Sequence, residues 1–390
     1  MASKTQEIVD GIKDTVFTRG SKDKQSEEID EGSLSKLLIP SGCTILNLGC
    51  SDNAQGAFTP GHMVNLIGDS SAGKTFVAFT MLADMAHNSL FDDYRLIYDD
   101  VEEANEFDIP RQFGQKLADR LEPPAFITED GVELDKFSDT VQDFQIHVDD
   151  AIKDGRPFIY VLDSLDALTS RDEQATVEEN LNKIRKGTAP SGSYGMDKPK
   201  ALSQFLRLVV GKLKRTKSFI LVVSQTRDNI SPMAFAQKTR SGGRALKFYC
   251  SHEIWLAEGA KEKKKEREIG KMVYAKITKN KITGKARDVE FPIYNDYGVD
   301  DIGACIAFLV QEGIWKSGTK SAMTGGTVIS GMQEFIGIEK CTRDKLIREI
   351  EAQGKYKDLV ALTEKTWKDI EDSIKLGRLS KYPTTDCLQG

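Results

Sequence analysis

The chain has 390 residues and a formal net charge of −6 at pH 7, and charged side chains make up 29% of it. A chain of this length exceeds the size at which single hydrophobic cores stop growing, so we expect one large domain with smaller appendages. The negative charge argues against a protein that coats nucleic acid by bulk charge, and no apolar run approaches the ~18 residues that a membrane span needs.

Three regions follow one another along the chain. Residues 1–35 are polar and charged, with a weakly amphipathic patch at Ile8, Ile12, Val16 and Phe17 that predicts a short helix before a flexible linker. A disordered tail is the alternative interpretation of this segment. Residues 36–325 carry the main α/β pattern, and we expect residues 326–390 to form a small C-terminal domain and tail.

The most informative stretch of the main region is a glycine-framed turn between an apolar run and a helical pattern. The run Met63 to Ile67 precedes Gly68-Asp69-Ser70-Ser71-Ala72-Gly73-Lys74-Thr75, and an apolar helical pattern follows. A strand, a glycine turn and a helix that begins at Lys-Thr are the context of a phosphate-binding loop, whose backbone N–H groups surround the phosphates. We expect Lys74 to reach the terminal phosphates of ATP and Thr75 to bind Mg²⁺.

After this loop, apolar strand patterns alternate with helical ones, which predicts a mostly parallel, twisted sheet flanked by helices. The expected strands are 95–98, 125–127, 158–162 and 218–223, and the expected helices are 141–152 and 202–213. Three further strands, 252–256, 272–279 and 289–294, follow without helices between them and predict an antiparallel extension. The charged stretch Lys261 to Arg267 between them is interpreted as a hairpin tip, with a binding patch as the alternative.

From Met332 onward the pattern is helical and charged. Trp367, Ile370 and Ile374 share one helical face. The sequence therefore predicts a small helical domain at the C-terminal end.

Acidic and amide side chains follow the expected strands where they would meet the nucleotide. Asp163 closes the strand 158–162 and is predicted to hold Mg²⁺ together with Thr75. Glu102 is predicted to activate the attacking water, with Glu103 and Asp100 as rivals. Gln225, at the tip of the strand 218–223, is predicted to sense the γ-phosphate.

Two long segments after these strands carry basic residues and no clear period. The first, 226–243, contains Lys238, Arg240, Gly242 and Gly243, and the second, 169–199, ends in Lys198 just before Lys200. Long loops without structure of their own are usually functional, and this composition suits contact with a phosphate backbone. Because both segments follow strands that end at the nucleotide, nucleotide state and loop order are expected to be linked.

Four stretches, in this order along the chain, resemble the RecA family of DNA strand-exchange proteins, and its bacterial and phage branch most. They are Val161-Leu162-Asp163-Ser164-Leu165-Asp166-Ala167-Leu168, Val223-Ser224-Gln225-Thr226-Arg227, Ser241-Gly242-Gly243-Arg244-Ala245-Leu246-Lys247-Phe248-Tyr249 and Lys276-Ile277-Thr278-Lys279-Asn280-Lys281-Ile282. The resemblance runs from about residue 39 to 314. It implies a RecA-like ATPase core and an N-terminal oligomerisation segment.

The resemblance also implies a function. A family member would form an ATP-driven helical filament on single-stranded DNA, pair it with homologous duplex DNA and exchange strands. Single-strand-binding and mediator proteins are the further partners expected of such a protein. It would act in the cytoplasm of a bacterium or of a phage-infected host.

The family's functional positions fall on particular residues of this chain. Glu102 falls on the water-activating glutamate and Gln225 on the γ-phosphate sensor. The family's basic DNA contacts fall on Lys200 and Arg207, and its second DNA loop falls on Gly242, Gly243 and Arg244. The aromatic residue that couples subunits falls on Phe248. The lysine pair that reaches the neighbour's ATP falls on Lys279 and Lys281. The two lysines lie two residues apart, so their side chains leave the same face of a strand and can converge on one anion. A solvated basic edge strand is the alternative explanation for them.

The chain also departs from the family. Residues 171–199 form a longer segment than the family's first DNA loop, and the C-terminal residues 375–390 lack the acidic tail of the bacterial proteins. Phe107 and Phe113 are both candidates for stacking on adenine. A hexameric helicase with the same core, which would need a larger N-terminal domain, and a RecA-like ATPase that acts on proteins are the competing functions.

Overall fold

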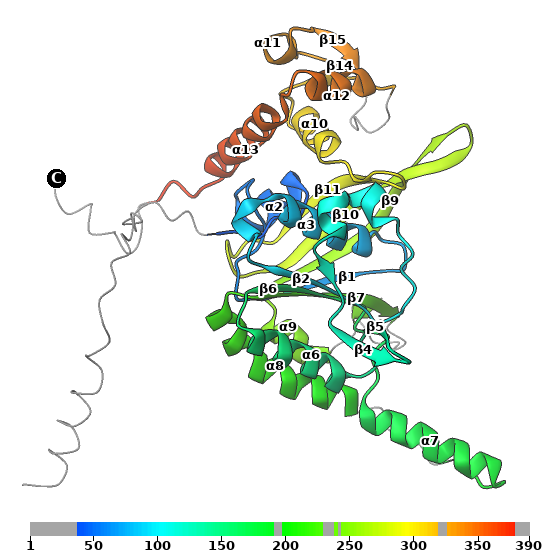
Figure 1. Cartoon of the computed structure of the whole chain (residues 1–390). Coiled ribbons are helices and arrows are strands. Elements are labelled where there is room, and N and C mark those ends of the chain that lie inside the picture. Colours follow the sequence, from blue (N-terminus) through cyan, green and yellow to red (C-terminus); the bar gives the residue numbers. More distant parts are fainter. Residues whose placement is uncertain (1–36, 191–196, 229–237, 241–242, 319–325, 379–390) are drawn as a thin grey trace, which may run out of the picture. The chain divides into compact units, whose positions relative to one another are not determined.

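The computed structural model describes residues 37–190, 197–228, 238–240, 243–318 and 326–378 (Figure 1). The chain divides into two units, residues 1–37 and 38–390, and the elements described below belong to the second unit. The predicted N-terminal helix lies outside the described residues. The boundaries predicted at residues 35 and 325 remain predictions.

A large mixed sheet forms the centre of this unit, in the strand order β12-β11-β10-β9-β1-β7-β6-β2-β3, with β8 paired to β7. Its strands are β1 (Met63–Gly68), β2 (Arg95–Asp100), β3 (Leu121–Glu122), β6 (Phe158–Asp163), β7 (Phe219–Asp228), β8 (Lys238–Arg240), β9 (His252–Lys264), β10 (Arg267–Asn280), β11 (Arg287–Tyr294) and β12 (Gly298–Val299). The strands from β3 to β9 run parallel to their neighbours in this order, and β10, β11 and β12 are antiparallel. The predicted mostly parallel sheet with an antiparallel extension is confirmed.

Helices cover both faces of the sheet, which explains why the central strands are apolar along their whole length. The helices α6 (Val141–Asp154), α8 (Asp197–Thr216) and α9 (Gly243–Tyr249) lie on one face, and α2 (Thr44–Ser51), α3 (Lys74–His87) and α10 (Asp301–Gln311) lie on the other (Figure 1). On the first face, Phe144 of α6 and Phe205 of α8 pack at 5.0 Å between ring centres. Shorter helical turns, η1 (Ser89–Phe91), α4 (Ile109–Phe113) and α5 (Gln115–Ala118), follow α3 and β2.

The strand predicted at 125–127 exists, but it is neither buried nor part of the main sheet. It forms β4 (Ala125–Glu129), which pairs only with β5 (Val132–Lys136) in a two-stranded hairpin. Phe126 is 52% exposed there. Asp130 and Gly131, at φ 49° and 81°, form the two-residue turn that favours such hairpins. This Asp-Gly signal explains why the segment pairs with itself.

The segment 169–199 is not a structureless loop, so that prediction is wrong. Its first half is the helix α7 (Arg171–Arg185), and α8 already begins at Asp197. The Ser170 and Glu173 side chains form a capping box at the start of α7. Each accepts a hydrogen bond from the other residue's backbone N–H, and this signal was readable in the sequence.

The C-terminal region contains strands as well as the predicted helices. Its elements are β13 (Lys316–Ser317), β14 (Val328–Ser330), α11 (Gln333–Ile336), β15 (Lys340–Thr342), α12 (Arg343–Ala352) and α13 (Tyr356–Ser373). Leu309 of α10, Ile329 of β14 and Leu359 of α13 belong to one core. The predicted face of α13 buries Trp367, but Ile374 lies beyond the helix and is exposed.

Within the ranges that the structure describes, no helix combines the length and the apolar character that crossing a bilayer requires.

Candidate active site

The glycine-framed segment lies where predicted, between the end of β1 at Gly68 and the start of α3 at Lys74. Gly73 has φ 91°, a left-handed conformation that residues with a Cβ atom rarely adopt. A Cβ at Gly68 would come within 2.8 Å of the Leu256 carbonyl oxygen on β9. The path of the loop therefore requires a glycine at position 73, and the neighbouring strand β9 requires one at position 68. Both requirements hold whether or not a phosphate is bound.

Lys74 folds back over this loop. Its Nζ donates hydrogen bonds to the carbonyl oxygens of Gly68 at 3.0 Å and Asp69 at 2.7 Å. Burial lowers the pKa of this ammonium group, while the carboxylates of Asp163 and Asp69 oppose that shift. The cation is thus held inside the loop, beside the backbone N–H groups at the start of α3 that favour an anion.

Thr75 and Asp163 lie side by side at the start of α3 and the end of β6. The Thr75 hydroxyl donates to Asp163 Oδ2 at 2.8 Å, and the Tyr98 hydroxyl donates to the same oxygen at 3.0 Å. Burial raises the pKa of the Asp163 carboxyl. A hydroxyl and a carboxylate are the hard oxygen ligands that suit Mg²⁺, so these residues fit the predicted metal.

Glu102 is in contact with the ends of two other strands. Its Oε1 accepts hydrogen bonds from the Ser164 hydroxyl at 2.7 Å and from Gln225 Nε2 at 3.1 Å. The two predicted site residues Glu102 and Gln225, 123 positions apart in the chain, are therefore in direct contact.

The rival acids are placed differently. The Asp100 carboxylate accepts a hydrogen bond from the Asn105 backbone N–H at 3.0 Å, which closes the turn after β2. Burial raises the pKa of Asp100. Glu103 has the left-handed φ of 48°. Of the three acids, Glu102 alone is held by Ser164 and Gln225 in the described structure, and its catalytic role remains a prediction.

Three further residues support the site and were missed by the sequence analysis. The Thr226 hydroxyl donates to the Asp69 carboxylate, and the Lys271 ammonium of β10 donates to the Ser71 carbonyl. Asp166 Oδ2 accepts the Gln225 backbone N–H at 2.6 Å. Thr226 and Asp166 stand in the stretches that carry the family resemblance, but no local pattern indicates that Lys271 reaches the loop.

A cavity of about 210 Å³ opens beside Thr75 and Asp163 and is also lined by Glu102 and Phe107. Phe107 packs against Phe76 at 4.9 Å between ring centres. Phe113, the other candidate for stacking on adenine, is buried. Phe107 therefore lines the cavity at the proposed metal site and Phe113 does not, and the choice between them for stacking on adenine stays a prediction.

The predicted DNA-contacting residues fall into two groups near the site. In the first, Lys198 Nζ donates to the carbonyl oxygens of Leu165 at 2.9 Å and Asp166 at 3.1 Å, whereas Lys200 and Arg207 are exposed on α8. Lys198 thus fixes the turn after β6, and only the other two present their charge to solvent.

The second group lies beyond β7. Lys238 and Arg240 belong to β8, which pairs with Thr226 to Asp228, so part of the segment predicted to lack structure is a β-ribbon. Gly243 and Arg244 begin α9, and Gly242 lies outside the described residues.

Phe248 and Lys279 lie together at the C-terminal end of α9. Phe248 is 71% exposed. Lys279 Nζ donates to the carbonyl oxygens of Lys247 and, at 3.0 Å, of Phe248. Burial, with the positive charge of Lys281, lowers the pKa of Lys279. Lys279 is therefore bound to the last turn of α9, where a cation also interacts favourably with the helix dipole.

The fold and this site define an α/β protein with a nucleotide-binding type of loop at the carboxyl edge of a parallel sheet. The family model described as the RecA N-terminal domain matches residues 14–300, so the chain belongs to the RecA family. Protein RecA of Geobacter sulfurreducens is 25% identical over 340 residues, which cover 87% of this chain and 90% of that protein. Protein RecA of Methylobacterium radiotolerans is 26% identical over 349 residues, covering 84% and 88%.

Proposed function

We propose that this chain is an ATP-dependent recombinase that assembles as a helical filament on single-stranded DNA and catalyses homologous pairing and strand exchange. Family membership suggests an ATPase with a recombinase or strand-exchange function. The observation that carries the proposal is the contact between Glu102 and Gln225, because it joins a candidate catalytic acid to the strand that leads into a predicted DNA loop.

Each residue at the nucleotide would have a distinct role. Lys74 and the N–H groups of the 68–75 loop would bind the phosphates, and Thr75 and Asp163 would hold Mg²⁺, which when bound neutralises charge on the β- and γ-phosphate oxygens. Glu102 would accept a proton from the attacking water or orient it. The hydrogen bonds from Ser164 and Gln225 support this role, since they fix the position of the carboxylate.

The same residues offer a route from nucleotide to DNA. Gln225 is followed directly by Thr226, which contacts Asp69 of the loop and pairs with Arg240 of β8. A γ-phosphate that moved Gln225 would move the ribbon in which Lys238 and Arg240 lie. Lys200, Arg207, Gly242, Gly243 and Arg244 complete the proposed DNA surface.

The proposal extends to the filament. Phe248 would contact a neighbouring subunit, and Lys279 and Lys281 would reach the neighbour's ATP. The cytoplasmic location, and the single-strand-binding and mediator proteins as partners, also remain predictions.

Measurement of ATP hydrolysis with and without single-stranded DNA, together with electron microscopy of the DNA complex, tests this function. We expect DNA-stimulated hydrolysis, helical filaments and loss of both in Lys74→Ala. Closed hexameric rings would indicate a helicase instead, and hydrolysis indifferent to DNA would contradict the proposal.

A further inference from the structure

A second, larger cavity lies between the antiparallel strands and the C-terminal helices. Its volume is about 870 Å³, within the range of ligand-binding sites. Apolar side chains dominate its lining, among them Trp255, Tyr274, Val289, Phe308, Trp367 and Ile370. We call it the α10–α13 groove.

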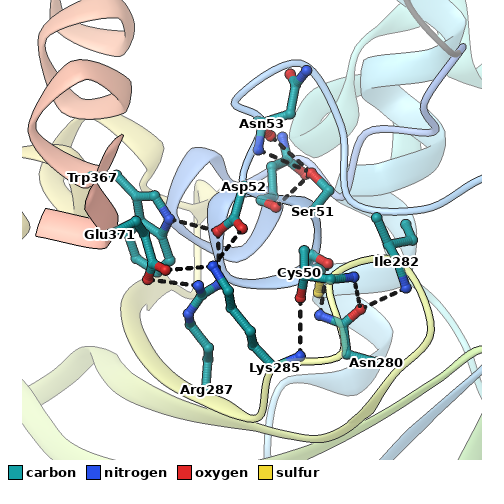
Figure 2. A network of polar contacts seen from close by, with 12 residues as sticks. Cys50, Ser51, Asp52, Asn53, Asn280, Ile282, Lys285, Arg287, Trp367 and Glu371 are labelled. Carbon is teal, nitrogen blue, oxygen red and sulfur yellow. Dashed lines mark hydrogen bonds and ion pairs between the residues drawn. The ribbon is translucent and has the colours of Figure 1, made fainter. Parts of the chain in front are cut away.

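One wall of the groove is fixed by a network of polar contacts (Figure 2). On α13, Trp367 Nε1 donates to Asp52 Oδ1 at 2.9 Å, and Glu371 pairs with Lys285 at 2.6 Å and with Arg287 at 2.6 Å. The Arg287 guanidinium also lies 5.0 Å from the centre of the Trp367 ring. The groove is therefore a built feature with a rigid side, because α13 is bound to α2 and β11 through charged groups.

The rim of the groove is acidic. Asp288, Glu290 and Glu312 line it without a hydrogen-bond or ion-pair partner among the residues described, against one cation, Lys276. Glu290 is partly buried, and this burial raises the pKa of its carboxyl. A carboxylate held at an apolar surface is stabilised by a cation that approaches it. The groove thus favours an occupant that is both apolar and positively charged.

The groove also contains an unpaired strand edge. The short strand β12 pairs only with Ile293 and Tyr294 of β11, and in the described structure residues 287–291 pair on one side only, with β10. Exposed edges of this kind are templates for pairing with another chain unless something covers them.

The chain itself supplies a segment of the required chemistry next to the groove. Beyond the end of α13 at Ser373, Ile374 is 68% exposed and Leu376 is 83% exposed, and Lys375 and Arg378 lie among them. The sequence continues with Leu379, Lys381 and Tyr382. Residues 374–383 therefore carry three cations and no anion, together with large apolar side chains.

We propose that residues 374–383 bind in the α10–α13 groove of their own chain. Ile370 and Glu371 already line the groove, so the segment begins at its wall. At ~3.3 Å per residue, its extended chain can reach about 30 Å from there. Gly377 has open space around it and permits a change of direction. Lys375 pairs with Asp372 of α13. Arg378 and Lys381 would pair with Glu290 and its acidic neighbours, the apolar side chains would cover the aromatic lining, and the open edge of β11 would be covered.

Tryptophan fluorescence of the full-length chain tests the proposal. Two of the three tryptophans, Trp255 and Trp367, line the groove, and Trp315 is buried. We expect acrylamide to quench the double variant Leu376→Asp, Arg378→Glu more strongly than the wild type. Leu90→Asp, Arg348→Glu makes the same chemical changes at exposed positions outside the groove and should leave quenching unchanged.

Hydrogen exchange gives a second readout. In the double variant, amide exchange in residues 287–291 should accelerate about tenfold, because a bound segment would protect that edge. A charge swap tests the electrostatic part. Glu290→Lys should increase quenching as Arg378→Glu does, and the combination of the two should restore the wild-type value in part.

The outcomes separate the possible occupants. Quenching and exchange that are the same in the wild type and the double variant would overturn the proposal. A difference that appears only as the protein concentration rises would also overturn it and would identify a second copy as the source of the segment. A concentration-independent difference that weakens at high salt supports it.

Discussion

The carboxylate of Glu102 accepts a hydrogen bond from the side-chain amide of Gln225 at 3.1 Å, and this contact joins β7 to the turn after β2. The Ser164 hydroxyl approaches the same oxygen from β6 at 2.7 Å. Three neighbouring strands of the sheet thus converge on one acid. Parallel strands end at one edge of the sheet, and α/β proteins place their reactive groups at this edge.

The first prediction concerns Glu102. Glu102→Gln keeps the shape and hydrogen-bonding capacity of the side chain but removes the group that would accept a proton. We expect nucleotide binding to persist and hydrolysis to slow by about 10²–10⁴-fold, the usual contribution of a general base. Single-turnover hydrolysis with nucleotide affinity measured separately checks this.

Glu103→Gln is the matched control for that experiment, because it makes the same change one residue along the same turn. It should hydrolyse ATP nearly as fast as the wild type. If Glu103→Gln is the slow variant and Glu102→Gln is not, the assignment of the catalytic acid is wrong.

The second prediction concerns DNA affinity. Arg240 and Arg244 should contact phosphates, so each contact removed should lower the slope of log affinity against log salt by about 0.7 for a single strand. Titration of labelled single-stranded DNA with Arg240→Ala, Arg244→Ala at several salt concentrations measures the slope. Lys263→Ala, Lys264→Ala, at the tip of the β9–β10 hairpin, is the control and should leave it unchanged. If both double variants keep the slope of the wild type, Arg240 and Arg244 do not belong to the DNA site.

Local sequence signals sufficed for the sheet and for the position of the loop between β1 and α3, for an identifiable reason. Buried parallel strands are apolar throughout, and the residues after them, such as Asp163 and Gln225, must lie at a common edge. Where the structure differs from the predictions, a local capping or turn signal decides the structure, as at Ser170 for α7 and at Asp130 for the β4–β5 hairpin.

Other contacts could not be predicted from local patterns at all. Lys271 reaches the Ser71 carbonyl, and Lys279 reaches α9, because the antiparallel strands fold back beside β1, and nothing in their own sequence indicates a partner. The α10–α13 groove depends in the same way on tertiary packing, since α2, β11 and α13 are far apart in the chain.

The third prediction concerns acid stability. His252 is fully buried, and burial lowers its pKa to about 4. The neutral form is therefore favoured in the folded state, and the stability that this gives is present above the unfolded pKa of about 6.5 and lost as the pH falls toward 4. The loss amounts to about 3 kcal/mol at most.

Urea unfolding at pH 7.5 and at pH 5 measures this effect. His252→Gln retains a side chain that can donate to the Cys50 carbonyl, which lies 3.4 Å from His252 Nε2, but it does not titrate. We expect the variant to lose less stability than the wild type between the two pH values, while His87→Gln, at an exposed position, behaves as the wild type does. Equal losses in all three proteins would contradict the prediction.

The last prediction concerns Lys279 and Lys281, which the family resemblance assigns together to the neighbour's ATP but which this structure places differently. Lys279 donates to the last carbonyls of α9, whereas Lys281 is exposed and its backbone N–H bonds to the Ser251 carbonyl at 3.1 Å. A cation at a helix C-terminus contributes about 1 kcal/mol. Lys279→Ala should therefore destabilise α9, which carries Phe248, and should also remove a charge from the proposed shared site.

The two variants separate these effects. Lys281→Ala should reduce DNA-stimulated hydrolysis and leave hydrogen exchange in α9 unchanged, whereas Lys279→Ala should reduce hydrolysis and also accelerate exchange at the C-terminal amides of α9. Mixing either variant with Lys74→Ala tests action between subunits, because a filament that alternates them would contain some interfaces with both lysines and an intact loop. Activity of the mixture no greater than that of its two components would count against a shared site, and unchanged exchange in Lys279→Ala would show that its contact with α9 carries little energy.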